Sequence, residues 1–195
     1  MNRILSFGLV MLLVTAAHAQ LQVGARFGTG PRNLATYNPV LDKYVTSGSL
    51  NGIQAGVFGS LGIGSRLGVQ AELLYATKGS LDSLLSTSKI NLNYITVPIM
   101  ARIRIIGPVA VEVGPEFGFL YLAQQVQNGN ATNVKAIYSN AVDLSLNAGL
   151  VLRPFKKLRG GLRYSTGLSN VTDLSTVDVR NRVTTVYLEY AFLGK

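Results

Sequence analysis

Apolar and polar positions alternate most clearly in residues 91–122, NLNYITVPIMARIRIIGPVAVEVGPEFGFLYL. Between Ile95 and Ile105 every second residue is apolar, and the intervening positions include Arg102 and Arg104. After Gly107-Pro108 the alternation resumes, with two glutamates on the polar face. Period two is typical of a strand whose two faces meet different surroundings. The stretch therefore predicts a β-hairpin with its charged side chains on one face.

The same period recurs in other segments of the chain. These predicted strands are residues 21–30, 51–63, 67–78, 141–153, 159–168 and 182–192. The predicted connections are long at 31–49, 79–88, 124–140 and 169–181, and short at 64–66, 107–108 and 154–158. Connections this short join antiparallel neighbours, and a closed meander leaves no exposed edge. We predict an all-β fold, an eight-stranded antiparallel up-and-down barrel with every long loop at one rim.

Charged residues gather on the polar face of the predicted strands. They are Arg26, Glu72, Lys78, Arg102, Arg104, Glu112, Glu116, Asp143, Arg153, Arg163 and Glu189. Six positive charges against five negative ones, with arginine outnumbering lysine, suit a closed lumen in which charges pair. Glycine is frequent on the same face, which lets a narrow lumen fill without clashes. We therefore predict that these eleven residues form a charge network inside the barrel.

The opposite face carries Ile, Leu and Val, with aromatic residues nearer the strand ends, as in the interfacial girdles of membrane barrels. A soluble lipocalin-type carrier would have the same strands with the apolar face inward, and it is the alternative interpretation. In a membrane, the reversed orientation would expose the basic residues to lipid. Each one near the midplane would then destabilise the barrel by about 2 to 4 kcal/mol. Domains are stable by only roughly 5 to 15 kcal/mol. We therefore predict a transmembrane barrel with a packed polar lumen.

Residues 1–19 have the pattern of a secretory signal peptide. Arg3 precedes an apolar run at 4–14, and Ala17-His18-Ala19 forms a cleavage site. The apolar run is shorter than the roughly 18 to 20 residues that a spanning helix needs. The expected division is a signal peptide at 1–19 and a barrel domain at 20–195, placed in the outer membrane of a Gram-negative bacterium. The chain has no cysteine, which excludes a lipoprotein anchor and disulfides.

The chain has few of the residue types that catalytic sites commonly use. Its one histidine, His18, lies in the predicted signal peptide, and without His or Cys there is no Ser-His or Cys-His pair and no usual zinc ligand set. The loop carboxylates Asp42, Asp82, Asp173 and Asp178 form no cluster with calcium-ligand spacing. We predict no enzymatic activity, no metal and no cofactor. The 18 Lys and Arg outnumber nine Asp and Glu, but they are dispersed rather than clustered with aromatics, so nucleic-acid binding is not expected.

Four segments carry a family resemblance. They are ELLYATKG at 72–79, LNYITVPIMAR at 92–102, VGPEFGFLY at 113–121 and GLRYSTGLSNV at 161–171. Together they resemble the PorT-like outer-membrane β-barrel family of Bacteroidota, also described as porin-family proteins. The resemblance implies a fold and a location, and through PorT a link to secretion. Many members have Glu where Thr96 stands, and barrels of this kind commonly end on an aromatic residue, whereas Phe192 here is followed by three more residues.

Several hypotheses remain for the function of such a barrel. Eight strands enclose only enough space for their own side chains, so a general porin is not expected. The favoured prediction is a structural, surface-interaction or assembly role without catalysis. The alternatives are a small-solute or ligand-binding transport barrel and the soluble lipocalin-type carrier. Expected partners are outer-membrane lipid, the barrel-assembly machinery, and a protein or ligand at extracellular loops 31–49 and 124–140.

Overall fold

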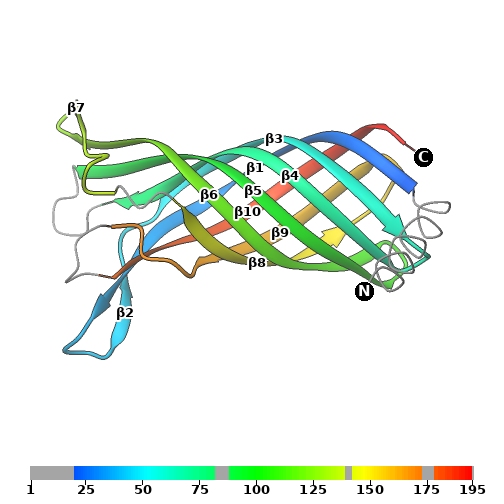
Figure 1. The fold of residues 1–195 in the computed structure, drawn as a ribbon, viewed down its shortest axis with the longest axis horizontal. Helices are drawn as coiled ribbons and strands as arrows, with labels where there is room; N and C mark the ends of the chain where they lie inside the picture. The colour runs from blue at the N-terminus through cyan, green and yellow to red at the C-terminus, as the bar shows by residue number, and fades with distance from the viewer. Residues whose placement is uncertain (1–19, 82–87, 139–141, 173–177, 195) are drawn as a thin grey trace, which may run out of the picture.

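The computed structural model describes residues 20–81, 88–138, 142–172 and 178–194, and these form strands joined by turns and loops (Figure 1). The predicted signal peptide lies outside the described residues. The strands are β1 (Gln20–Asn38), β2 (Lys43–Thr46), β3 (Leu50–Ile63), β4 (Leu67–Leu81), β5 (Ser88–Ile106), β6 (Val109–Gln127), β7 (Asn130–Asn133), β8 (Asp143–Leu152), β9 (Leu158–Gly167) and β10 (Val179–Leu193). No helix among the described residues is long and apolar enough to cross a membrane.

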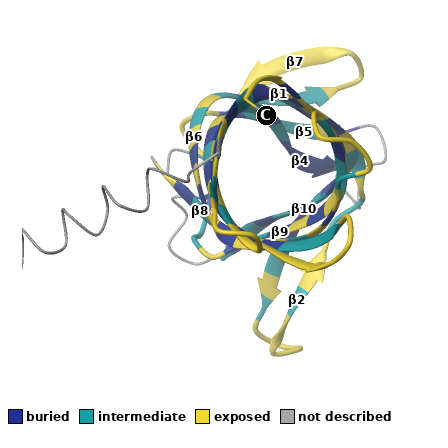
Figure 2. Cartoon of the chain, turned by 90° about the vertical axis from the view of Figure 1, so that its right-hand side faces the viewer, coloured by how far each residue is buried: buried dark blue, intermediate teal, exposed yellow. Residues whose placement is uncertain are grey.

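Eight of these strands form a closed ring, which Figure 2 shows end-on. Each is antiparallel to its neighbours in the order β1, β3, β4, β5, β6, β8, β9 and β10. The ring closes where β1 pairs with β10, for example at Arg26 opposite Glu189. Closure satisfies the backbone groups that an open edge would leave unpaired. The predicted eight-stranded antiparallel up-and-down barrel is confirmed.

Burial alternates along the strands with the polar side inward. On β5, Met100 is fully buried and Arg102 is 8% exposed, whereas Ile99 and Ile103, which flank this pair in the sequence, are 44% and 40% exposed. The same alternation runs through β4, β6 and β10. The apolar-out interpretation is therefore confirmed, and the lipocalin-type alternative, which needs the apolar face inside, is wrong. Side chains fill the ring that Figure 2 shows as a ribbon.

The two ends of the barrel differ, and we name them by their connections. The short-turn end holds the connections at 64–66, 107–108 and 153–157, together with the C-terminus (Figure 1). The long-loop end holds the other connections and both short strands, β2 and β7, which extend beyond the barrel wall in Figures 1 and 2. Gly107 has a φ of 51°, which a tight turn between β5 and β6 requires and glycine tolerates.

The segments predicted as loops 31–49 and 124–140 contain more strand than expected. Strand β1 runs on to Asn38 and pairs with β2, and β6 runs on to Gln127 and pairs with β7. The β6–β7 turn is Asn128-Gly129, both with positive φ, which is the turn chemistry of a two-residue hairpin. The prediction of plain loops there is wrong: both segments have the polar composition of loops, and 124–140 also contains the Asn-Gly turn of a hairpin.

Candidate functional site

Ten charged side chains form an ion-paired network across the lumen. The cations are Arg26, Lys78, Arg102, Arg159 and Arg163, and the anions are Glu72, Glu112, Glu116, Asp143 and Glu189. Their side chains are between 0% and 9% exposed. Five charges of each sign allow the network to be neutral overall, as burial demands. The residues come from strands on all sides of the ring, so the network ties opposite walls together.

Glu72 and Arg163 lie at the centre of this network. The guanidinium of Arg163 donates through Nη1 and Nη2 to the two oxygens of Glu72, at 2.9 and 2.8 Å, and through Nε to Glu112 at 2.7 Å. Arg26 approaches Glu72 from β1, with Nη1 2.9 Å from Oε1. Bidentate arginine–carboxylate pairs are the strongest and most directional of such contacts. One carboxylate thus holds two guanidiniums from different strands.

Arg102 extends the network towards the short-turn end. Its Nη2 and Nη1 donate to Glu189 at 2.7 and 2.9 Å, and its Nε donates to Glu112 at 3.0 Å. Gln70 accepts from Arg102 at 2.6 Å and donates to Glu189 at 2.8 Å, so the amide bridges the pair. Every oxygen of Glu189 therefore has a donor. Gln70 on β4 and Arg102 on β5 therefore hold the Glu189 carboxylate in position.

A second cluster lies nearer the long-loop end. Lys78 is fully buried, and its Nζ is 2.9 Å from Glu116 Oε1 and 2.8 Å from Asp143 Oδ2. Asn147 donates to Glu116 at 3.1 Å, and Asn181 donates to Asp143 at 2.9 Å. Each carboxylate therefore has a lysine and an amide as donors. Lys78 also lies 5.1 Å from the centre of the Tyr94 ring, a cation–π contact.

An apolar layer closes the lumen above the Lys78 cluster. It contains Leu34, Leu92, Tyr94, Ala123, Val134, Val171 and Val179, all less than 10% exposed. Val134 belongs to the segment after β7, and its backbone N–H donates to the Ala123 carbonyl. Val171 belongs to the loop before β10, and its N–H donates to the Val179 carbonyl. The described parts of the long-loop connections thus place buried hydrophobic side chains in the lumen at this end.

Glycine makes room for large side chains in the lumen. A Cβ on Gly161 would lie 2.4 Å from Tyr187 Cζ, so only glycine permits this tyrosine to lie against β9. Tyr187 donates its hydroxyl to Glu112 at 2.9 Å, and the Arg26 guanidinium lies 3.6 Å from the centre of its ring. A glycine on one strand thereby positions an aromatic ring that satisfies two charged groups.

The structure separates two of the eleven predicted lumen residues from the other nine. Arg104 and Arg153 lie at the short-turn mouth, Arg104 exposed and Arg153 half-buried, and neither forms an ion pair with a described residue. The expected pairing of Arg104 with carboxylates across the lumen is therefore wrong. Its alternation placed it on the inner face, but it lies beyond the level of the glutamates.

One member of the network and several residues that contact it are absent from the sequence prediction. Arg159 is 6% exposed and has the same strand parity as Arg163, so alternation alone could have found it. Arg32 is equally buried and donates to the Lys78 carbonyl and to Asn91, but it lies in the segment predicted as a loop. Gln70 and Tyr187 carry no charge, and no sequence signal marks them as bridges.

A smaller polar contact anchors the hairpin of β1 and β2 outside the barrel. Arg180 donates to Asp178 through Nη2 at 2.8 Å, and the Tyr44 hydroxyl also donates to Asp178. The hydrogen bonds from Arg180 lower the pKa of Asp178, and the bond to Asp178 raises the pKa of Tyr44. The backbone N–H of Tyr37 donates to the Asp178 carbonyl at 2.9 Å. The base of β10 therefore fixes the hairpin's orientation.

The carboxylates of the lumen are arranged as ion-pair partners rather than as an acid–base pair. Glu112 and Glu116 belong to different clusters, the first bound by arginines and the second by Lys78. No group of three or more His, Cys, Asp or Glu among the described residues could hold a metal ion. Two of the loop carboxylates considered for calcium, Asp82 and Asp173, lie outside the described residues. The chemistry that the described residues offer is charge pairing.

Solved structures of other proteins have a similar architecture. The crystal structure of Ail, the attachment invasion locus protein of Yersinia pestis, in complex with the heparin analogue sucrose octasulfate, aligns with a TM-score of 0.51 and 15% identity over 89% of this chain and 99% of Ail. Neisserial surface protein A aligns with a TM-score of 0.57 and 12% identity over 87% of this chain and 97% of that protein. At these identities the likeness shows the fold alone.

A sequence comparison with curated proteins finds no match. The family model for the outer membrane protein beta-barrel domain matches residues 15–173, most of the chain. That match agrees with the ring of eight antiparallel strands, their apolar outer face and the ion-paired lumen. The chain therefore belongs to the outer membrane protein beta-barrel domain family.

Proposed function

We propose that this protein is a closed outer-membrane barrel that passes no solute and presents an interaction surface at the cell exterior. The observation that carries the proposal is the obstruction of the lumen at two successive levels, the ion-paired network and the apolar layer above it. A transport barrel needs a continuous polar path, as the wide barrels of porins have. The contacts described above leave the long-loop connections as the part of the chain available for function.

The hairpin of β1 and β2 is the best-defined part of the proposed interaction surface. At its tip Val40 is 90% exposed and Leu41 is 53% exposed, beyond the barrel wall. The Tyr37 and Tyr44 rings pack edge to face at 5.5 Å, and Tyr44 is bonded to Asp178, so the tip stands on a fixed base. Exposed apolar side chains on a rigid element are a favourable anchor for a protein partner.

The closed-lumen proposal is tested by electrical recording. The protein purified, refolded and inserted into planar bilayers is expected to give no steady open-channel current in potassium chloride. A matched variant, Lys78→Ala with Glu116→Ala, removes an ion pair without changing net charge and is expected to stay closed, because the Glu72–Arg163 contacts and the apolar layer still obstruct the lumen. Folding of both is checked by heat-modifiable migration on a gel. A steady current from the unaltered protein would overturn the proposal and favour the solute-transport alternative.

The orientation and the tip are tested by labelling. Because the chain has no cysteine, a single introduced cysteine is the only thiol. Val40→Cys is expected to react with a membrane-impermeant maleimide in intact cells, whereas Lys156→Cys, in the β8–β9 connection at the short-turn end, is expected to react only after the outer membrane is opened. A photo-crosslinking residue at position 40 should then yield one discrete adduct that the same residue at position 132, on β7, does not. No adduct at either position would contradict the interaction role.

Four finer assignments belong to this proposal. Residues 1–19 would act as a signal peptide, leaving 20–195 as the mature barrel, and the barrel-assembly machinery would insert it. The four motifs quoted above support a PorT-like member from Bacteroidota, and that resemblance carries the suggested link to secretion. The absence of His and Cys from residues 20–195 supports a role without catalysis. Determining the mature N-terminus by mass spectrometry tests the first of these assignments.

A further inference from the structure

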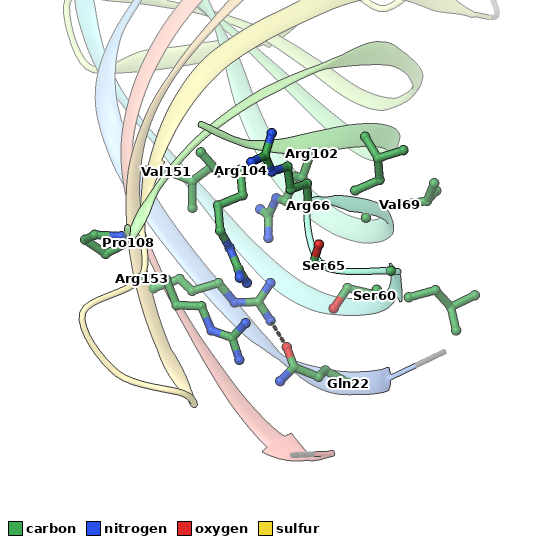
Figure 3. A pocket seen from close by; sticks show the side chains of 17 residues that line it. Gln22, Ser60, Ser65, Arg66, Val69, Arg102, Arg104, Pro108, Val151 and Arg153 are labelled. Atoms are coloured by element: carbon green, nitrogen blue, oxygen red, sulfur yellow. Dashed lines mark hydrogen bonds between the residues drawn. The ribbon is translucent and has the colours of Figure 1, made fainter. Parts of the chain in front are cut away.

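Arginines converge on the short-turn mouth of the barrel (Figure 3). A cavity of about 130 Å³ opens there, lined by Arg66, Arg102, Arg104, Arg153 and Arg159, and no Asp or Glu is among its lining residues. A water molecule takes up about 30 Å³ of liquid, so the cavity has room for a small oxyanion. This end is opposite the proposed interaction surface, and the inference below does not depend on that surface.

Three of these arginines lack a compensating charge. Arg66, Arg104 and Arg153 form no ion pair with any residue that the structure describes. The backbone N–H of Arg104 donates to the Arg66 carbonyl at 2.8 Å, which holds the β3–β4 turn against the end of β5. Partial burial, and then the positive charge of Arg104, lower the pKa of Arg153. Like charges are therefore held close together where nothing on the described chain neutralises them.

Arg159 provides a second, independent observation. It is only 6% exposed and lines the cavity, yet its Nε makes no hydrogen bond. The Glu189 Oε2 atom is 3.7 Å from this Nε, beyond hydrogen-bond distance. The Nη2 of Arg159 donates to Gln22, which also lines the cavity, at 2.7 Å, and this bond fixes the guanidinium plane in the mouth. Arg159 therefore keeps a buried Nε donor that is ion-paired with Glu189 but not hydrogen-bonded, and a bound oxyanion beside it would supply the acceptor.

We propose that the short-turn mouth binds a phosphate group. Guanidinium groups match phosphate oxygens in pairs, and several arginines around one small cavity supply more donors than a carboxylate could accept. Two sources present this chemistry at a membrane surface: a phospholipid headgroup, and inorganic phosphate in solution. On the orientation proposed above, both reach the mouth from the periplasmic side.

The proposal is tested by removing two exposed arginines. Arg66→Gln with Arg104→Gln changes side chains that lie outside the ion-paired network, so the barrel is expected to fold. The matched control, Lys43→Gln with Lys135→Gln, removes the same charge from exposed positions at the long-loop end. Each protein is refolded in lipid-free zwitterionic detergent and its unfolding temperature followed against inorganic phosphate, with potassium chloride of equal ionic strength as the reference. Ligand binding to the folded state raises that temperature.

The expected result is a saturable rise with phosphate, absent with chloride, in the unaltered protein and in the control. The arginine variant should need at least about tenfold more phosphate. A rise unchanged in the arginine variant, or reproduced by chloride, would overturn the proposal.

The two sources are separated in a second arm. The proteins are incubated with vesicles of phosphatidylcholine with or without phosphatidylglycerol, re-extracted, and analysed by native mass spectrometry. Phosphatidylglycerol retained by the unaltered protein and lost from the arginine variant assigns a lipid headgroup. A phosphate response in detergent without lipid retention assigns the free anion. No response in either arm contradicts the site.

Discussion

The arginines in the middle of the lumen and those at the short-turn mouth are the same residue type in opposite circumstances. Arg102 and Arg104 are two positions apart on β5, yet Arg102 binds two glutamates and Arg104 binds none of the described carboxylates. Depth along the barrel makes the difference, because Glu72, Glu112 and Glu189 gather at one level. Guanidiniums at that level hold the fold together, and those beyond it are free to hold a ligand.

The largest effect that would test this difference between the two groups of arginines is expected from removing a carboxylate at the middle level. Glu72→Gln keeps the side-chain shape but leaves Arg26 and Arg163 buried with an uncompensated charge. Breaking a buried ion pair from one side costs about 3 to 5 kcal/mol. We expect the free energy of unfolding to fall by that amount, measured by urea titration in liposomes. Because the chain has no tryptophan, heat-modifiable gel migration reports the folded fraction.

The matched control is Arg66→Gln at the short-turn mouth. An exposed substitution away from the network is expected to change the free energy of unfolding by no more than about 0.5 kcal/mol. Equal losses for Glu72→Gln and Arg66→Gln would show that the two levels are energetically alike. The division into a structural middle and a free mouth would then be lost.

The second prediction applies the same comparison of depth to the outer face. Leu73 and Leu67 lie on β4 with the same exposure, 53%, but Leu67 is at the start of the strand beside the short turn. Leu73→Arg is expected to cost about 2 to 4 kcal/mol in a bilayer, and Leu67→Arg only about 0 to 1 kcal/mol. Urea titration in liposomes checks both. Losses of similar size would place the two leucines at similar depth in the membrane.

Most of the fold followed from the period-two pattern. Alternation identified which residues face the lumen, since side-chain direction in a strand is fixed by parity, and short connections fixed the neighbours. Parity alone therefore assigns Arg102 and Glu112 to one network, and the structure shows them in contact at 3.0 Å. The parity of a residue shows which face of the strand its side chain is on. It does not show how far along the barrel axis the side chain lies, because that depends on strand tilt and stagger. That is why Arg104 was assigned to the network and lies outside it.

The missed parts have a different cause. The hairpins of β2 and β7 lie where strands continue past the barrel and both faces meet water, so the alternation that marks a strand fades. Arg32 is buried, but it lies in a stretch of polar composition between Pro31 and Asn33 that is typical of a loop. Neutral bridges such as Gln70 become visible only when three strands are brought together. A polar residue's partners across a barrel are set by register and curvature, which the local sequence does not carry.

The smallest expected effect concerns the contact outside the barrel, and it depends on pH. Arg180 lowers the pKa of Asp178 below its ordinary value of about 3.9, so the contact stabilises the folded hairpin fully above that pH and is lost as the pH falls through the lowered value. Below about pH 4 we therefore expect the protection of the Tyr37 amide, relative to its intrinsic exchange rate at that pH, to fall, because this amide donates to the backbone carbonyl of Asp178 at the base of the hairpin, while amides of the barrel stay protected. Hydrogen exchange with mass spectrometry measures both. Asp178→Asn removes the titrating group, so the protection of the Tyr37 amide should already be low at neutral pH and should change little on acidification; an unaltered acid response in that variant would assign the effect to another group.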